Sequence, residues 1–289
     1  MNWKDKTMKP RVVAVILNYE SADLTCSCAD ELLSRYSGQL DLLIVDNNSS
    51  KGVDVLKSYC SSRDVKLIAS KSNGGYSSGN NIGLRYAYNS GYEFALIVNP
   101  DVVAVSDDLI DKAISVFDSN AQIAVVAPDV LHSAGYRQNP MREPCYFEEL
   151  LWPLELIKGK FSSLPAYHLD PSQSGACEKV SGCCFFVRMS FLAEVDFLDE
   201  GVFLYCEEPI LAAKVKQAGY IEYYMSDTRV LHNHKRGNDL SSSNLNRLLR
   251  SREYYLRNYS GYNEFKLKIL LFSLKVKNKF FSHLGGRNQ

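Results

Sequence analysis

The sequence predicts an α/β protein in which helices flank a mostly parallel central sheet. Two observations predict this class. Short apolar runs without a polar face, typical of strands covered on both sides, recur through the first half of the chain. Helical patterns separate these runs, which is the alternation of βαβ units. The chain has 289 residues, of which 46% are hydrophobic, so it can form a substantial core.

The elements follow in order along the chain. The strands expected in the first half are 11–17, 40–46, 65–70, 94–99 and 123–128, with helices at 22–36, 52–61, 77–90 and 107–118. Residues 133–175 are rich in Pro, Gly, Ser and aromatics and are expected to be irregular. The later strands are expected at 179–188, 221–224 and 229–233, and the later helices at 208–218, 243–258 and 264–281. We therefore expect one domain over 1–240 and a C-terminal helical extension over 241–289.

Charge and composition exclude several classes of protein. Lys plus Arg and Asp plus Glu balance at 33 each, which argues against a nucleic-acid partner. The cysteines lack the spacing of a zinc knuckle. The N-terminus has no signal-peptide pattern, and no apolar run is long enough for a membrane span. The expected location is the cytoplasm.

Each early strand is followed by a polar cluster. The four clusters are Asn18-Tyr19, Asp46-Asn47-Asn48-Ser49, Asn73-Gly74-Gly75 and Asn99-Pro100-Asp101. Such residues also form ordinary turns and helix N-caps, which is the alternative interpretation of any single cluster. Four clusters at the carboxyl edge of one parallel sheet instead indicate a ligand crevice.

The segment 72–87 contains many small residues just before a predicted helix. It matches neither a Walker loop nor the G-x-G-x-x-G fingerprint. A backbone of small residues beside a helix N-terminus still suits the oxygens of a diphosphate.

Seven segments, in this order, resemble the family 2 glycosyltransferases: VVAVILNYES, LLIVDNNSS, SNGGYSSGNNIGL, LIVNPDV, VSGCCFFVR, FLYCEEPILAAKVKQAG and VLHNHKRG. The branch they resemble most is the bacterial rhamnosyltransferase-like group that builds O-antigen and capsule. The resemblance covers residues 11–240. It implies a GT-A fold, a dTDP- or UDP-sugar donor, Mn²⁺ or Mg²⁺, and inversion at the anomeric carbon.

The resemblance also implies a metal site. Asp101 matches the last acid of the family's metal motif, and Asn99 fills its first position without charge. One carboxylate and the donor diphosphate would then share a hard divalent ion. His232 matches the family's metal-contacting histidine, with His234 as the reserve candidate. An imidazole among oxygen ligands favours Mn²⁺ over Ca²⁺. The alternative for a lone histidine is a structural role.

The donor and acceptor sides are implied in the same way. The residues that match the nucleotide-sugar pocket are Asn18, Tyr19, Asp46, Asn48, Asn73, Gly74, Asn81 and Asn99. Gly182 matches a small residue beneath the acceptor sugar, although simple packing explains it equally well.

The base that would deprotonate the acceptor lies in the segment Glu207-Glu208-Pro209-Ile210-Leu211. Glu208 stands where the family has its catalytic Asp, Glu207 precedes it, and Ile210 replaces a second acid. A Glu can abstract a proton from a longer arm. The alternative is that the two acids and Pro209 only favour a helix start.

The segment from Arg247 to the C-terminus interleaves Lys and Arg with aromatic residues and Leu. It suits an amphipathic helix on an anionic membrane surface, where a lipid-linked acceptor would be found. Plain packing of terminal helices is the alternative.

The expected function is thus inverting, metal-dependent sugar transfer to a glycan or lipid-linked acceptor in cell-surface polysaccharide biosynthesis. A sugar-nucleotide pyrophosphorylase would need a basic glycine-rich signature near the N-terminus, which is absent from the sequence. A degenerate family member that binds a nucleotide sugar or a partner without transfer is the other alternative, and the altered 207–211 segment supports it.

Overall fold

The computed structural model describes residues 9–153, 169–233 and 242–285. The strands are β1 (Val12–Asn18), β2 (Leu40–Asp46), β3 (Lys66–Ala69), β4 (Phe94–Val98), β5 (Val102–Ala104), β6 (Ile123–His132), β7 (Gly175–Cys177), β8 (Cys184–Arg188) and β9 (Ile221–His232). The helices are α1 (Ala22–Arg35), α2 (Val53–Arg63), α3 (Tyr76–Asn89), α4 (Leu109–Ser119), α5 (Tyr146–Leu150), α7 (Met189–Glu194), α8 (Glu207–Gln217), α9 (Ser242–Asn258) and α10 (Glu264–Gly285).

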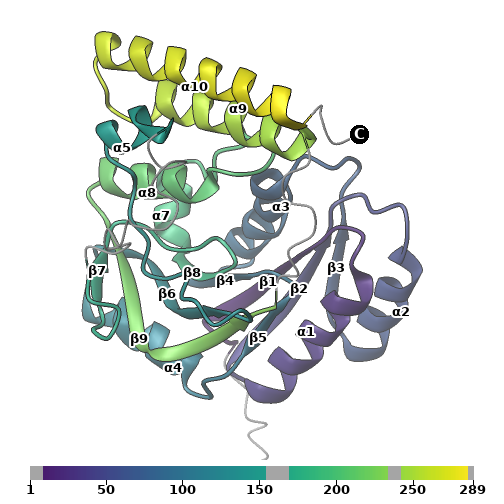
Figure 1. The fold of residues 1–289 in the computed structure, drawn as a ribbon. Helices are drawn as coiled ribbons and strands as arrows, with labels where there is room; N and C mark the ends of the chain where they lie inside the picture. Colours follow the sequence, from purple (N-terminus) through teal and green to yellow (C-terminus); the bar gives the residue numbers. More distant parts are fainter. Residues whose placement is uncertain (1–8, 154–168, 234–241, 286–289) are drawn as a thin grey trace, which may run out of the picture.

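One sheet forms the centre of the molecule, and helices cover both of its faces (Figure 1). Its strand order is β3-β2-β1-β4-β8-β6-β9-β5, and β7 pairs with β9 off this path. The pairs β3–β2, β2–β1, β1–β4 and β6–β9 are parallel. β8 is antiparallel to both β4 and β6. The sheet is therefore mixed: β1 to β4 and the β6–β9 pair are parallel as predicted, whereas β5, β7 and β8 run antiparallel to their neighbours. Strand direction was missed because a fully buried apolar strand has the same pattern either way.

The other differences concern short or irregular elements. The strands expected at 221–224 and 229–233 are one strand, β9, whose pairing with β6 shifts register between Pro128 and Asp129. Only Cys184–Arg188 of the run 179–188 is a strand. The elements β5, β7, α5 and α7 were not predicted. Each has six residues or fewer, which is too short to establish a period.

The strands β1 and β4 are buried on both faces, as their apolar sequences predict. Along β1, Ala14 and Ile16 point into the core beneath α1 and α4, whereas Val13 and Val15 point into the core beneath α3. β4 alternates in the same way. This two-sided burial leaves the strand ends as the places where polar side chains can gather.

The C-terminal helices α9 and α10 lie side by side across one end of the molecule (Figure 1). A third apolar cluster joins Ile210 of α8 to Leu256 of α9 and Leu270 and Leu271 of α10. One face of α10 therefore packs on the protein, as the alternative of plain terminal packing predicted. The expected boundary between residues 240 and 241 falls outside the described residues and stays a prediction. Every helix within the described ranges is too short or too polar to cross a membrane.

Gly75 brings the start of α3 against the loop before α8. Its φ of +90° and ψ of −169° belong to a region that only glycine occupies readily. A Cβ atom placed there would lie 2.0 Å from the carbonyl oxygen of Phe203. The next amide, that of Tyr76, donates a 3.0 Å hydrogen bond to this same oxygen. The chain can make this contact only because residue 75 has no side chain.

We expect Gly75→Ala to lower the free energy of unfolding by about 3 kcal/mol or more, because it adds a clash with Phe203 to backbone strain. The control is Gly91→Ala, which has φ of +78° and nothing within 4 Å of the added Cβ. It should cost about 1 kcal/mol. Urea denaturation followed by circular dichroism measures both. Equal losses of unfolding free energy in the two variants would show that the clash with Phe203 adds no cost.

Candidate active site

The ends of β1 and β2 form a buried polar pair. Asn18 and Asp46 are register partners, and the Asn18 amide donates a 2.7 Å hydrogen bond to the Asp46 carboxylate. The second Asp46 oxygen accepts the backbone N–H of Ser49 at 3.1 Å. Tyr19 beside this pair is 52% exposed, so its ring is accessible to a flat ligand such as a base. Asn48 is exposed in the following turn. The structure thus brings the pair together, and the nucleotide contacts of all four residues stay predictions.

A second network joins β2 to the glycine-rich segment. The amide of Asn47 donates to the side-chain oxygen of Asn73 at 2.9 Å and to the carbonyl of Gly75 at 3.0 Å. The Asn73 oxygen also accepts the N–H of Gly75 at 3.0 Å. Asn47 was not among the predicted site residues, although it belongs to the strand-end cluster. The network fixes the backbone around Gly74, which stays a predicted donor contact.

Asn81 has a different environment from the one that the resemblance implies. It is buried, and its amide donates to the carbonyl of Leu198 at 2.8 Å and to the carboxylate of Glu200 at 2.7 Å. Its oxygen accepts the N–H of Leu198 at 3.0 Å. These bonds give Asn81 the role of holding the loop before α8 against α3. A donor contact for Asn81 stays a prediction.

Asp101 and His232 meet at the ends of two distant segments. The Nε2 atom of His232 lies 3.3 Å from a carboxylate oxygen of Asp101, and Nδ1 lies 2.8 Å from the side-chain oxygen of Gln138. Burial lowers the pKa of His232, but hydrogen bonds to Asp101 and Cys183 outweigh burial and raise the pKa above its ordinary value. His234 lies outside the described residues.

This pair fits a divalent ion. One carboxylate and one imidazole are donors that Mn²⁺ accepts. Their 3.3 Å separation is close to the ~3 Å between adjacent ligands of an octahedral ion with ~2.1 Å bonds. Within the described ranges, no three or more His, Cys, Asp or Glu side chains form a group that could hold a metal ion by themselves. Sites of this kind complete their coordination with substrate phosphates and water.

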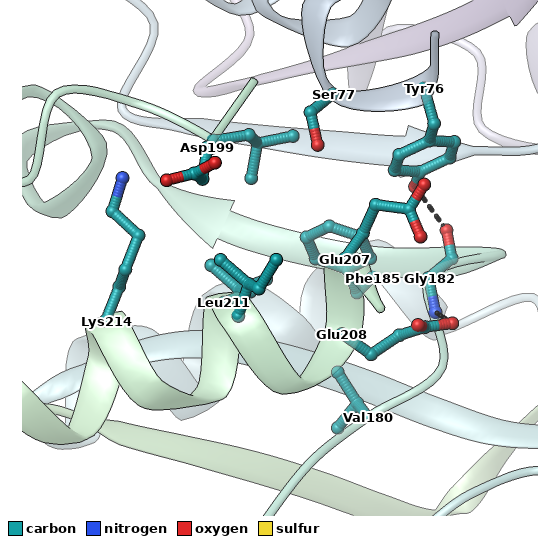
Figure 2. A pocket seen from close by; sticks show the side chains of 12 residues that line it. Tyr76, Ser77, Val180, Gly182, Phe185, Asp199, Glu207, Glu208, Leu211 and Lys214 are labelled. Carbon is teal, nitrogen blue, oxygen red and sulfur yellow. Dashed lines mark hydrogen bonds between the residues drawn. The ribbon is translucent and has the colours of Figure 1, made fainter. Parts of the chain in front are cut away.

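The two acids of the 207–211 segment open helix α8. Tyr205 and Cys206 both have positive φ, so the chain turns sharply into the helix, which begins at Glu207. Figure 2 shows both carboxylates directed from the first turn of α8 toward Gly182. They line a cavity together with Tyr76, Ser77, Val180, Gly182, Phe185, Leu198, Asp199, Ile210, Leu211 and Lys214.

Glu207 and Glu208 have different surroundings. Burial, and next the charge of Glu208, raise the pKa of Glu207 to about 8. Its Oε1 atom is buried and makes no hydrogen bond within the described part of the chain. Glu208 instead accepts the N–H of Gly182 at 3.4 Å. Burial therefore favours the protonated form of Glu207 near neutral pH.

Gly182 lies between Tyr76 and Glu208. The buried Tyr76 hydroxyl donates to the carbonyl of Gly182 (Figure 2). A Cβ at Gly182 would lie 3.4 Å from the Glu208 carboxylate and 3.6 Å from the Tyr76 hydroxyl. A side chain larger than a methyl group would therefore fill the space between the two. Tyr76 was missed by sequence reasoning, although an aromatic residue directly after Gly74-Gly75 is a visible signal.

The next residue, Cys183, joins this cavity to the candidate metal pair. Its carbonyl accepts the N–H of Asn99 at 2.8 Å, and its thiol contributes to the raised pKa of His232. Two consecutive residues thus touch Glu208 on one side and the Asn99–Asp101 segment on the other. Gln138, which orients His232, lies in the stretch expected to be irregular, and no sequence signal marked it.

Known proteins resemble this chain in sequence and in fold. The model of the Glycosyl transferase family 2 matches residues 13–195. The Low-salt glycan biosynthesis hexosyltransferase Agl10 of Haloferax volcanii is 28% identical over 208 residues, which are 70% of this chain and 61% of that protein. The chain therefore spans less than two thirds of the length of this relative.

Two solved structures share the fold. The mannosyltransferase PcManGT from Pyrobaculum calidifontis, in complex with GDP-Man and Mn²⁺, has a TM-score of 0.62 at 16% identity, covering 96% of this chain and 74% of that chain. GalNAc-T7 with UDP, GalNAc and Mn²⁺ has a TM-score of 0.62 at 15% identity, covering 94% of this chain and 56% of that chain. The expected GT-A fold is thereby confirmed. Because the family model covers more than half of the chain, this protein belongs to glycosyl transferase family 2.

Proposed function

We propose that this protein is an inverting, metal-dependent hexosyltransferase. It moves a sugar from a nucleoside diphosphate carrier, dTDP or UDP, to a hydroxyl of a glycan or lipid-linked acceptor in cell-surface polysaccharide synthesis. Rhamnose is the sugar that the sequence resemblance favours. The name of the Haloferax relative supports hexosyl transfer in glycan biosynthesis, and the Mn²⁺ and nucleotides in the structural neighbours support the donor side.

One observation carries the proposal: Gly182 contacts Glu208, and the next residue, Cys183, pairs with Asn99, two residues before the Asp101 that meets His232. An inverting transfer needs a base on the acceptor side and charge stabilisation on the leaving-group side, within the length of one sugar. A divalent ion held by Asp101 and His232 would offset the negative charge of the departing diphosphate.

Glu208 is the base in this mechanism. A general base must be ionised at working pH, and the raised pKa of Glu207 leaves that residue protonated. The N–H of Gly182 orients the Glu208 carboxylate. Glu208 takes the proton of the acceptor hydroxyl, whose oxygen attacks the anomeric carbon on the face opposite the nucleotide. In the neutral form that burial favours, Glu207 adds no second negative charge beside the base.

Asp101→Ala should abolish metal-dependent nucleotide binding, because it removes one of the two candidate ligands. Calorimetric titration of UDP, dTDP and GDP, each with and without Mn²⁺, measures this and also identifies the carrier. Asp111→Ala, which changes an exposed acid on α4, is the matched control and should bind as wild type does. Binding that ignores both the metal and Asp101 would contradict the donor assignment.

Glu208→Gln should lower kcat by about 100-fold or more while leaving nucleotide affinity unchanged, because it removes only the base. The assay is release of nucleoside diphosphate from the donor that the titration identifies. Glu194→Gln on α7, an exposed position away from the cavity, serves as control. Tight nucleotide binding with a turnover that Glu208→Gln leaves unchanged would favour the degenerate, binding-only alternative.

Glu207→Gln should make the protein more stable than wild type at alkaline pH. Folding raises the pKa of Glu207, so the stability that its protonated form contributes is complete below pH about 4.5 and disappears as pH rises through about 8. Glutamine stays neutral, so the difference in unfolding free energy should grow to a few kcal/mol by roughly pH 9. Urea denaturation across this range measures it. Parallel curves for the two proteins would mean that Glu207 ionises normally.

A further inference from the structure

Helix α10 has two apolar faces, and only one of them packs on the protein. Leu270 and Leu271 are buried against α8 and α9. On the opposite side, Phe265 is 73% exposed, Phe272 is 70% exposed and Val276 is 45% exposed. The spacings of seven and four residues place these three side chains on one face of the helix. We call Phe265, Phe272 and Val276 the outer stripe.

Lysines border the outer stripe. Lys268, Lys275 and Lys279 follow Phe265, Phe272 and Val276 by three residues each, and all three are exposed. The acid of α10 is Glu264, at its first position. An exposed apolar row beside a basic row is the composition of a helix that lies in the interface of an anionic bilayer.

We propose that the outer stripe of α10 binds the surface of a membrane that contains anionic lipids. The phenylalanines enter the boundary between headgroups and acyl chains, and the lysines contact lipid phosphates. A second copy of this chain fits the surface less well, because a two-fold contact would bring the lysine rows of both partners together, and the acid of each α10, Glu264, already pairs with Lys268 at 3.5 Å. Other exposed apolar side chains, such as Leu24 of α1 and Val55 of α2, have no such row of lysines around them.

The helix pair is also fixed to the candidate active site. The hydroxyls of Tyr254 and Tyr259 both donate to the carboxylate of Asp199, which lines the cavity of Glu207 and Glu208. Ser251 of α9 donates to the carbonyl of Leu204 at 2.7 Å. A membrane bound at α10 would therefore lie at a fixed distance from the cavity, as a lipid-linked acceptor requires. Membrane binding itself does not depend on the proposed transfer.

The test is sedimentation of the full chain with sucrose-loaded vesicles, made either of phosphatidylcholine alone or of equal parts phosphatidylcholine and phosphatidylglycerol. We expect binding to the anionic vesicles that falls between about 0.1 M and 0.5 M NaCl, because salt screens the lysines. Phe265→Gln with Phe272→Gln should lower the partition coefficient about tenfold or more. Lys268→Gln with Lys275→Gln should abolish the preference for anionic vesicles.

The control is Leu24→Gln with Val55→Gln, which removes apolar side chains of α1 and α2 that are 53% and 50% exposed and should bind as wild type does. Circular dichroism confirms that each variant is folded, and the wild-type comparison of the two vesicles stands without any variant. Absence of wild-type binding, or binding that the outer-stripe variant retains, would overturn the proposal. A wild-type dimer that Phe265→Gln with Phe272→Gln dissociates would assign the stripe to a second copy instead. The nucleotide titration tests the proposed sugar transfer independently, so a failure of membrane binding can be distinguished from a failure of the proposed function.

Discussion

The antiparallel insertion of β8 between β4 and β6 is the constraint on which the candidate site depends. Its register places Cys184 opposite Val98, so Cys183 continues the pairing to Asn99 just beyond the strand end. Asp101 follows two residues later and meets His232 at the end of β9. On its other side, Gly182 leaves the sheet between Tyr76 and Glu208. A single strand register thus sets the separation between Glu208 and the Asp101–His232 pair. A slip by one residue would exchange the two faces of β8 and separate these groups.

Small residues of helix α3 bring this helix close to the sheet, and this also positions the candidate site. A Cβ on Gly79 would lie 2.6 Å from Leu17, and one added to Gly83 would lie 2.6 Å from Val15. The helix therefore lies directly on β1 and β2, closer than side chains at these positions would permit. That proximity lets Tyr76 reach Gly182. The small residues of the segment 72–87 were interpreted as a backbone cradle for a diphosphate. In the structure, Gly79 and Gly83 of this segment pack α3 against the sheet. A segment that binds a diphosphate would therefore also have this packing role.

The sequence predicted the parts of the molecule that follow from local pattern and strand order. Asn18 and Asp46 were placed at one edge because consecutive parallel strands end there, and they share a hydrogen bond. What could not be predicted depends on contacts between distant segments. The motif predicts a donor contact for Asn81, but it does not indicate that the Asn81 amide donates a hydrogen bond to Leu198, 117 positions away. Gln138 contacts His232 from a stretch without any period. The two faces of α10 have similar apolarity, so only packing distinguishes the buried face from the exposed one.

At Ile210 the sequence departs from the family pattern, and the packing of α8 against α9 and α10 explains this isoleucine. Its side chain is 2% exposed and belongs to the apolar cluster that α8 forms with α9 and α10. A carboxylate at this position would lose its hydration among these apolar side chains, which is costly. The isoleucine therefore matches the helices that cover it. Ile210 and the C-terminal helices thus pack together, and Glu208 stays in contact with Gly182. Packing against α9 and α10 therefore accounts for an apolar residue at position 210, while Glu208 remains available for the role proposed for it.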